Sequence, residues 1–216
     1  MRLRLDAHED QALQILCLGC HSDDIEIGCG GTILQFREKY PKCRFHWVVF
    51  SANGVREAEA RRGAELFGGA ERLSQLILKN FPDGFMPFVG AEVKRVFEEL
   101  KQAVAPDLVF THNRHDAHQD HRLLAELTWN TFRNHMILEY EIPKYDGDLG
   151  QPNVFVSLDR GTCDRKVSYL TEAFGSQRTK RWFENDTFLS LMRIRGMECN
   201  AADNYAEAFY ARKLVL

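Results

Sequence analysis

The sequence lacks any apolar run long enough to cross a membrane. Its longest hydrophobic stretches, such as HWVVF at 46–50, are far shorter than the roughly 20 residues that a membrane-spanning helix needs. The first eleven residues, MRLRLDAHEDQ, are too polar for a signal peptide. These absences predict a cytoplasmic protein without a membrane span.

An excess of positive charge is also absent. The 28 lysine and arginine residues are outnumbered by 31 aspartate and glutamate residues, and the formal net charge is −3. A chain with this balance has no general attraction for a phosphate backbone. Nucleic acid is therefore not an expected partner.

A compact cysteine framework is missing as well. The six cysteines are spread along the chain, at positions 17, 20, 29, 43, 163 and 199. Scattered cysteines are typical of reduced thiols in a reducing compartment rather than of a disulfide scaffold. Cys17 and Cys20 form a C-x-x-C pair, but they lie in ILCLGC, which reads as a buried strand. Side chains three apart on a strand point to opposite faces, so we expect no joint metal or redox role for this pair.

Alternating strand and helix patterns predict one α/β domain over residues 1–216. We expect strands near 15–20, 45–50, 74–78 and 107–111, separated by helices near 29–39, 56–68, 90–104 and 119–132. Such repeated βα units form an open, mostly parallel sheet with helices on both faces. After about residue 137 we expect a C-terminal elaboration of two strands joined by a long loop, followed by helices near 162–174 and 187–196.

Polar side chains of the metal-binding type follow the first and fourth predicted strands. His21, Asp23 and Asp24 come just after the first strand, and HNRHDAHQDH at 112–121 follows the fourth. In a sheet of order 3-2-1-4 these two strands are neighbours, and ligands bind at the carboxyl ends of such strands. We therefore expect the two segments to face each other.

Two imidazoles and a carboxylate around one open position are a known catalytic arrangement for zinc. A divalent cation would also stabilise the crowded acidic groups of the first segment. Asp23 and Asp24 point in different directions on a turn, so one can bind the metal while the other accepts a proton. His118 and His121 share one face of a helical turn, so one can bind the metal while the other meets the substrate.

The glycine cluster GCGGT at 28–32 suggests an alternative, a phosphate-binding loop of a dinucleotide fold. The cluster lacks the G-x-G-x-x-G spacing, and the preceding Asp23, Asp24 and Glu26 would repel a pyrophosphate. We interpret the glycines as allowing tight turns and close packing of the first helix.

The same segments carry a family resemblance. GCHSDDIEIGCGGTI at 19–33 resembles the HPDDE…GCGGT signature of the PIG-L/LmbE-type deacetylases, and DAHQDHR at 116–122 resembles their HxDH signature. VREAEARRGAELFGG at 55–69 is similar to the Arg-x-x-Glu helix of the family. Shorter matches to a sugar-deacetylase branch are SQ at 176–177, RIRG at 193–196 and YAEAF at 205–209. One departure is Ser22, which stands where the family usually has proline.

This resemblance implies a Rossmann-like fold and a zinc-dependent N-deacetylase that acts on N-acetylglucosamine-type sugars. It implies that His21, Asp24 and His121 bind the metal and that Asp23 is the general base. The same ligands accept other first-row ions such as Fe²⁺. The implied partner is a small N-acetylated sugar or glycoconjugate, and a homo-oligomer remains an open alternative.

Other residues carried over from the family concern the substrate and the leaving group. His118 would stabilise the oxyanion or protonate the leaving amine, and Asp120 would orient a histidine. Arg56 and Asp83 match positions that would contact the sugar. Local sequence supports a helix-start ion pair for Arg56 and a turn for Asp83 equally well.

Two other functions use the same residues. A metal-dependent phosphoesterase would need a second metal ion or a basic cluster, and the segments described above are acidic. A non-catalytic sugar- or metal-binding protein would lack a base or a ligand, and here every such position is filled. The polar and aromatic loop EYEIPKYDGDLGQPN at 139–153 is a candidate wall of a sugar pocket, because loops of this kind determine specificity on a fixed scaffold.

Overall fold

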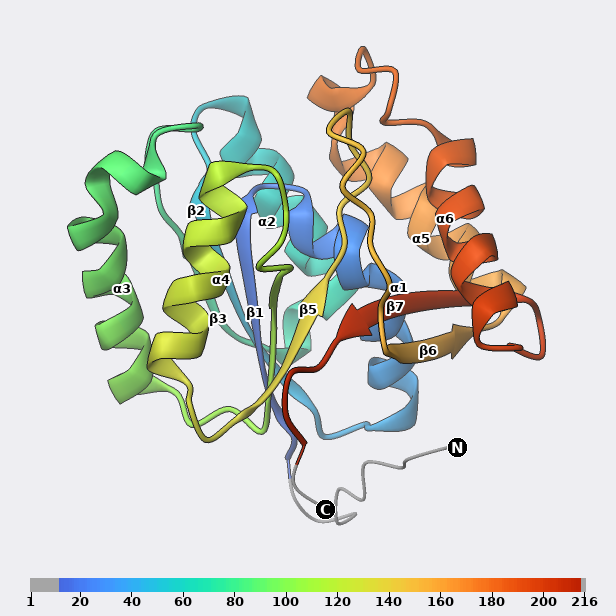
Figure 1. The fold of residues 1–216 in the computed structure, drawn as a ribbon, viewed down its shortest axis with the longest axis horizontal. Coiled ribbons are helices and arrows are strands. Elements are labelled where there is room, and N and C mark those ends of the chain that lie inside the picture. The colour runs from blue at the N-terminus through green and yellow to red at the C-terminus, as the bar shows by residue number, and fades with distance from the viewer. Residues whose placement is uncertain (1–11, 215–216) are drawn as a thin grey trace.

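The computed structural model describes residues 12–214 and contains one seven-stranded sheet (Figure 1). The strand order is β3-β2-β1-β4-β5-β7-β6, with β7 antiparallel to both of its neighbours and the remaining pairs parallel. The strands are β1 Gln14–His21, β2 Arg44–Ser51, β3 Leu73–Leu78, β4 Leu108–His112, β5 Met136–Tyr140, β6 Val154–Leu158 and β7 Tyr205–Tyr210. The predicted α/β class and the predicted order 3-2-1-4 are confirmed. The polar segment 1–11, which the sequence excludes as a signal peptide, lies outside the described residues.

Six α-helices cover the two faces of the sheet in the described part of the chain. They are α1 Asp24–Lys39, α2 Val55–Gly68, α3 Gly90–Ala103, α4 Gln119–Thr131, α5 Arg160–Ala173 and α6 Asn185–Glu198. Short 3-10 helices are η1 Ala70–Arg72, η2 Met86–Val89 and η3 Gly175–Gln177. None of the helices in residues 12–214 has the length and apolar character that crossing a membrane requires.

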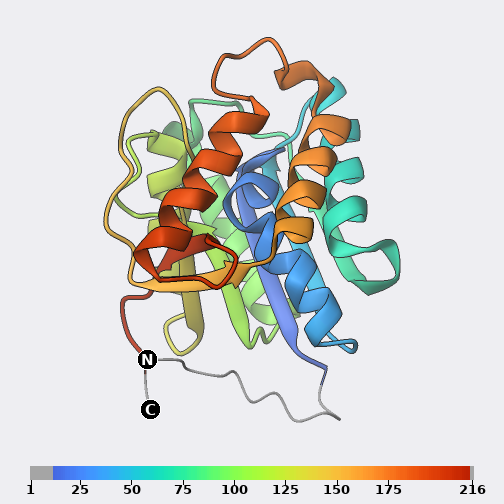
Figure 2. The same cartoon turned by 90° about the vertical axis from the view of Figure 1, so that its right-hand side faces the viewer.

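The sheet separates two hydrophobic cores. Helices α1, α2, α5 and α6 pack on one core, and α3 and α4 pack on the other. Figure 2 shows α6, α5 and α2 side by side on the first face. Cys17 belongs to the first core and Cys20 to the second, which confirms that they point to opposite faces. All six cysteines are free.

Helix α1 begins at Asp24, five residues earlier than predicted. The backbone leaves helical geometry at Cys29, with φ −141° and ψ 16°, so α1 is two helical segments joined by a kink. The predicted start near 29 is therefore the start of the second segment only. Buried amides at the start of this second segment donate to the carboxylate of Glu207, at 2.7 Å from Gly31 N and 2.6 Å from Thr32 N. A carboxylate of the protein thus takes the place that a phosphate occupies in a dinucleotide fold.

The glycine cluster serves close packing, as interpreted from the sequence. A Cβ atom at Gly28 would overlap the ring of Tyr140, which comes from β5. Glycine at this position therefore allows α1 to lie against the carboxyl end of the sheet.

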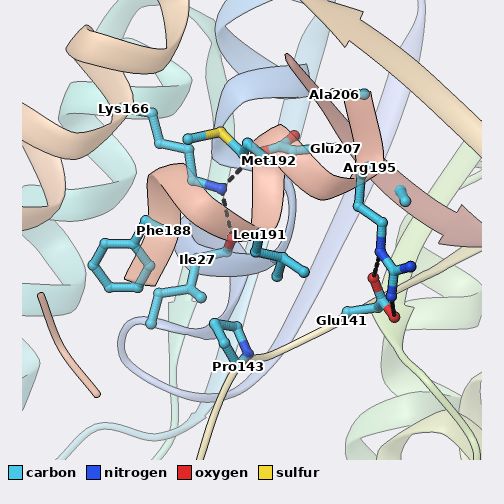
Figure 3. Close-up of a pocket in the computed structure, with 12 residues that line it drawn as sticks. Ile27, Glu141, Pro143, Lys166, Phe188, Leu191, Met192, Arg195, Ala206 and Glu207 are labelled. Carbon is cyan, nitrogen blue, oxygen red and sulfur yellow. Dashed lines mark hydrogen bonds and ion pairs between the residues drawn. The ribbon is translucent and has the colours of Figure 1, made fainter. Parts of the chain in front are cut away.

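The C-terminal part differs from the simple pair of strands that was expected. Strands β5 and β6 are not neighbours, because β7 lies between them (Figure 1). The connecting loop is held by Arg195 of α6, which binds both carboxylate oxygens of Glu141 at 2.9 and 2.7 Å and donates to Gly150 O at 3.0 Å. Figure 3 shows this pair beside a cavity of about 20 Å³ that Lys166 and Glu207 also line. Such a volume has room for a single water molecule.

Candidate metal centre and active site

The two polar segments meet at the carboxyl ends of β1 and β4, which pair directly in the sheet. His21 is the last residue of β1, and Asp24 is the first residue of α1. His112 ends β4, and His121 lies in the first turn of α4. The parallel sheet thus brings together residues about a hundred positions apart, as expected from the strand order.

Three predicted ligand atoms form a nearly equilateral triangle. His21 Nδ1 lies 3.3 Å from Asp24 Oδ2 and 3.2 Å from His121 Nε2, and the latter two atoms are 3.6 Å apart. A tetrahedral zinc ion with bonds of 2.0–2.1 Å separates two of its ligands by about 3.4 Å. These three side chains therefore fit three of the four ligand positions of one tetrahedral ion.

The charges around His21 also favour a cation. Burial alone would lower the pKa of His21, but the carboxylates of Asp24, Asp120 and Asp83 outweigh it and raise the pKa well above its usual value. His21 Nε2 is 2.9 Å from Asp83 Oδ1 and 3.6 Å from Asp120 Oδ2. The cluster stabilises a positive charge at this point, which a proton or a divalent ion can supply.

Asp116 orients His121, although the sequence motifs do not predict this role for it. Its Oδ2 lies 2.9 Å from His121 Nδ1, which directs Nε2 into the triangle. Carboxylates in this position fix the tautomer of a ligating histidine. Burial and the neighbouring His112 ring lower the pKa of His121 to about 4, so the ring is neutral at neutral pH, as a ligand must be. A signal was present in the sequence, since Asp116 lies within the second polar segment.

Asp120 lies near Nε2 of His21, the ring nitrogen that is not part of the triangle. Its carboxylate accepts the backbone N–H groups of Gly84 at 2.7 Å and Met86 at 3.2 Å, which ties the loop after β3 to the start of α4. Asp83 lies in the same loop, and its side chain is 73% exposed. Asp83 is thus open to a ligand, while Asp120 supports the loop that carries it.

Asp23 contacts the first turn of α2 through one of its two carboxylate oxygens. Its Oδ1 is 2.6 Å from Arg56 Nη2, while its buried Oδ2 has no hydrogen-bond partner among the described residues. Burial raises the pKa of the Asp23 carboxyl, and Arg56 partly offsets this effect. Asp23 therefore has one oxygen fixed by a cation and one oxygen available to accept a proton.

Arg56, an expected substrate contact, is engaged by the protein itself. Besides Asp23 it binds Glu59 Oε2 at 2.7 Å, and Glu59 in turn accepts the Ser176 N–H at 2.7 Å. The ion pair at the start of α2 that the sequence suggested is thus present. The side chain of Arg56 remains 21% exposed, which leaves part of it accessible to solvent.

His118 caps the N-terminus of α4 and lies beside His21 and His121. Its Nδ1 accepts the Asp120 N–H at 3.3 Å, so the neutral ring carries its proton on Nε2. The ring centroid lies 5.0 Å from that of His21 and 4.6 Å from that of His121. Burial, together with His21, lowers the pKa of His118. The free Nε2–H is a hydrogen-bond donor beside the ligand triangle.

Two further residues are buried at the centre of the site, and the sequence motifs predict no role for either. His112 stacks on His121 with ring centroids 3.9 Å apart, and its Nε2 is 3.2 Å from Asp24 Oδ2. Cys20 precedes His21, and its N–H donates to His112 Nε2 at 3.0 Å. His115, the remaining histidine of the second segment, is exposed. Histidine spacing alone does not distinguish the central His112 from the peripheral His115.

An α/β fold with a candidate metal centre at the carboxyl edge of its sheet defines the general class of the protein. A family model described as PIG-L, GlcNAc-PI de-N-acetylase, matches residues 16–132, which is more than half of the chain. The chain belongs to this family. The match covers both polar segments and ends before β5.

Solved structures share the fold over nearly the whole chain. TT1542, a conserved protein from Thermus thermophilus, is 21% identical, with a TM-score of 0.75 and coverage of 94% of this chain and 96% of the other. The N,N'-diacetylchitobiose deacetylase from Pyrococcus horikoshii is 18% identical, with a TM-score of 0.66 and coverage of 93% and 84%. GalB, the 4-carboxy-2-hydroxymuconate hydratase from Pseudomonas putida, is 17% identical, with a TM-score of 0.70 and coverage of 94% and 98%. At these identities the likeness concerns the fold, and function has to be argued from the site.

Proposed function

We propose that the protein is a metal-dependent N-deacetylase that hydrolyses the acetamide of an N-acetylglucosamine-type sugar or sugar conjugate. The products are acetate and a free amine. The observation that carries this proposal is the triangle of His21, Asp24 and His121, together with the buried Asp23 Oδ2, which has no hydrogen-bond partner among the described residues. Membership of the de-N-acetylase family and the deacetylase with the same fold support the reaction class.

The three residues of the triangle would hold a divalent ion, with zinc as the first choice and Fe²⁺ as an alternative. Such an ion polarises an amide carbonyl and lowers the pKa of water at the site. Two imidazoles and one carboxylate suit this chemistry because they leave one position open.

The residues of the chain would move the protons. Asp23 accepts a proton from the attacking water at Oδ2, while Arg56 holds Oδ1. As the new C–O bond forms, negative charge develops on the former carbonyl oxygen, and His118 stabilises it by donating from Nε2. The C–N bond then breaks, and Asp23 or His118 delivers the proton that the leaving amine requires. Asp83, exposed beside His21, would accept hydrogen bonds from sugar hydroxyls.

The electrostatics disfavour a phosphoesterase. Two cations at the site are already paired with carboxylates of the protein. Arg56 binds Asp23 and Glu59, and Lys144 lies 3.0 Å from Asp116 Oδ1 and also pairs with Asp148. A phosphate group would have to compete with these carboxylates, whereas a neutral acetamide would not.

Acetate release from a panel of N-acetylated sugars and sugar conjugates tests the proposal. We expect acetate from at least one substrate, loss of activity with a chelator, and recovery on adding zinc or a similar ion. Sugar binding without acetate at any metal concentration would identify a non-catalytic binder. Phosphate released from phosphate esters, without acetate from any sugar, would favour the phosphoesterase.

A further inference from the structure

The thiol of Cys20 lies in the same cluster as two of the metal-binding candidates. Its Sγ, a carboxylate oxygen of Asp24 and one ring nitrogen each of His112 and His121 all lie within 4.8 Å of one another. All four residues are buried. Thiolate, carboxylate and two imidazoles are the donor types of a closed zinc site with four protein ligands.

This second set of four residues overlaps the open triangle. Both sets contain Asp24 and His121, but the triangle adds His21, whose side chain is 17% exposed, whereas the second set adds the buried Cys20 and His112. The two positions cannot both be filled at the same time, because each of them requires Asp24 and His121. The difference is chemical as well, since only the buried set contains sulfur.

We propose that Cys20, Asp24, His112 and His121 form a second, closed binding position for a thiophilic divalent ion, exclusive with the open position. A tetrahedral zinc thiolate site separates the sulfur from its nitrogen and oxygen neighbours by about 3.5 Å. The four donor atoms therefore have to approach one another by little more than about 1 Å, on the order of the change that rotation of the Cys20 and Asp24 side chains produces.

Binding in the closed position exchanges one set of interactions for another. The Cys20 thiol releases its proton to solvent as the sulfur–metal bond forms, and the hydrogen bond from Cys20 N–H to His112 Nε2 is given up. Sulfur ligands favour soft ions such as Cd²⁺ and Zn²⁺ over hard ions such as Mn²⁺ or Mg²⁺. An ion with four protein ligands has no place for water, so this form would be inactive in hydrolysis.

The test uses the full chain without metal, and its result does not depend on deacetylase activity. One equivalent of Cd²⁺ is added, and the ultraviolet charge-transfer absorption of a cadmium–thiolate bond is recorded. We expect this band in the wild type and in Cys17→Ser, a matched control because Cys17 lies on the same strand but faces the opposite core. We expect Cys20→Ser to lose the band.

A second variant distinguishes the closed position from the open one. His21→Ala removes a ligand of the triangle only, so we expect it to keep the band and to bind one Cd²⁺ per chain. The ¹¹³Cd chemical shift of the wild type reports sulfur ligation without any substitution, which keeps the test valid if a variant fails to fold. A wild type without sulfur ligation, or a band that persists in Cys20→Ser, would overturn the proposal.

Discussion

Replacing Asp23 by asparagine separates the proposed base from the proposed ligands. The asparagine side chain retains an oxygen for Arg56, whose Nη2 lies 2.6 Å from Asp23 Oδ1 in the native protein. The amide nitrogen then takes the place of Oδ2, where it cannot accept a proton. None of the three distances of the His21, Asp24 and His121 triangle involves this residue, so we expect Asp23→Asn to bind metal normally.

The expected loss is confined to the rate. A positioned general base contributes a factor of about 10²–10⁴. This factor corresponds to about 2.7–5.5 kcal/mol in the activation free energy. The loss should appear in kcat, because Asp23 acts on the attacking water and its Oδ1 remains occupied by Arg56.

Asp24→Asn is the matched comparison, since it makes the same chemical change one residue away. Asp24 Oδ2 lies 3.3 Å from His21 Nδ1 and 3.6 Å from His121 Nε2, so this variant should lose metal affinity and regain part of its activity with excess metal. Metal content by elemental analysis and kcat by acetate release are measured for both variants. A metal-free Asp23→Asn beside a metal-loaded, inactive Asp24→Asn would reverse the two roles. Two fully active variants would remove this segment from the mechanism.

Three further predictions concern groups around the site and in the core. Asp116→Asn should weaken metal binding about 10–100-fold, measured by competition with a chelator, because it removes the carboxylate that orients His121. Glu207→Gln should lower the free energy of unfolding by about 3–5 kcal/mol in urea titrations, because it leaves the buried Lys166 ammonium without its counterion at 2.6 Å; an unchanged midpoint would contradict this. Burial lowers the pKa of His46 in the folded protein. Below a pH of about 6.5 the unfolded chain therefore binds more protons than the folded protein does, and the stability should decrease as the pH falls through this range. His46→Gln should reduce this part of the pH dependence, and an identical slope in both proteins would refute it.

The order of helices and strands through α4 could be predicted from the sequence because the relevant signals are local. Strand β1 reads as a continuous apolar run because a parallel strand is covered on both faces. In α3, Val93, Val96, Phe97 and Leu100 recur at helical spacing and all face one core. The alternation of strand and helix segments implies a parallel sheet in which β1 and β4 are neighbours. The two polar segments that follow these strands are therefore expected to meet.

Local patterns could not reveal features that depend on distant partners. The kink of α1 at Cys29 is stabilised by Glu207, which lies 175 residues beyond Thr32. Strand β7 pairs between β5 and β6, although it follows both in the chain. No periodicity within a segment indicates which other segment will supply its hydrogen bonds.

For the candidate site, the sequence by itself determined which residue types are present and which two segments carry them. The family resemblance added the ligand triplet of His21, Asp24 and His121. Tertiary structure alone decided that Asp116 orients His121, and that Cys20 and His112 approach Asp24. The physical reason is that a donor set depends on distances of a few ångströms between side chains from β1, α1, β4 and α4, and only the packing of these elements determines such distances.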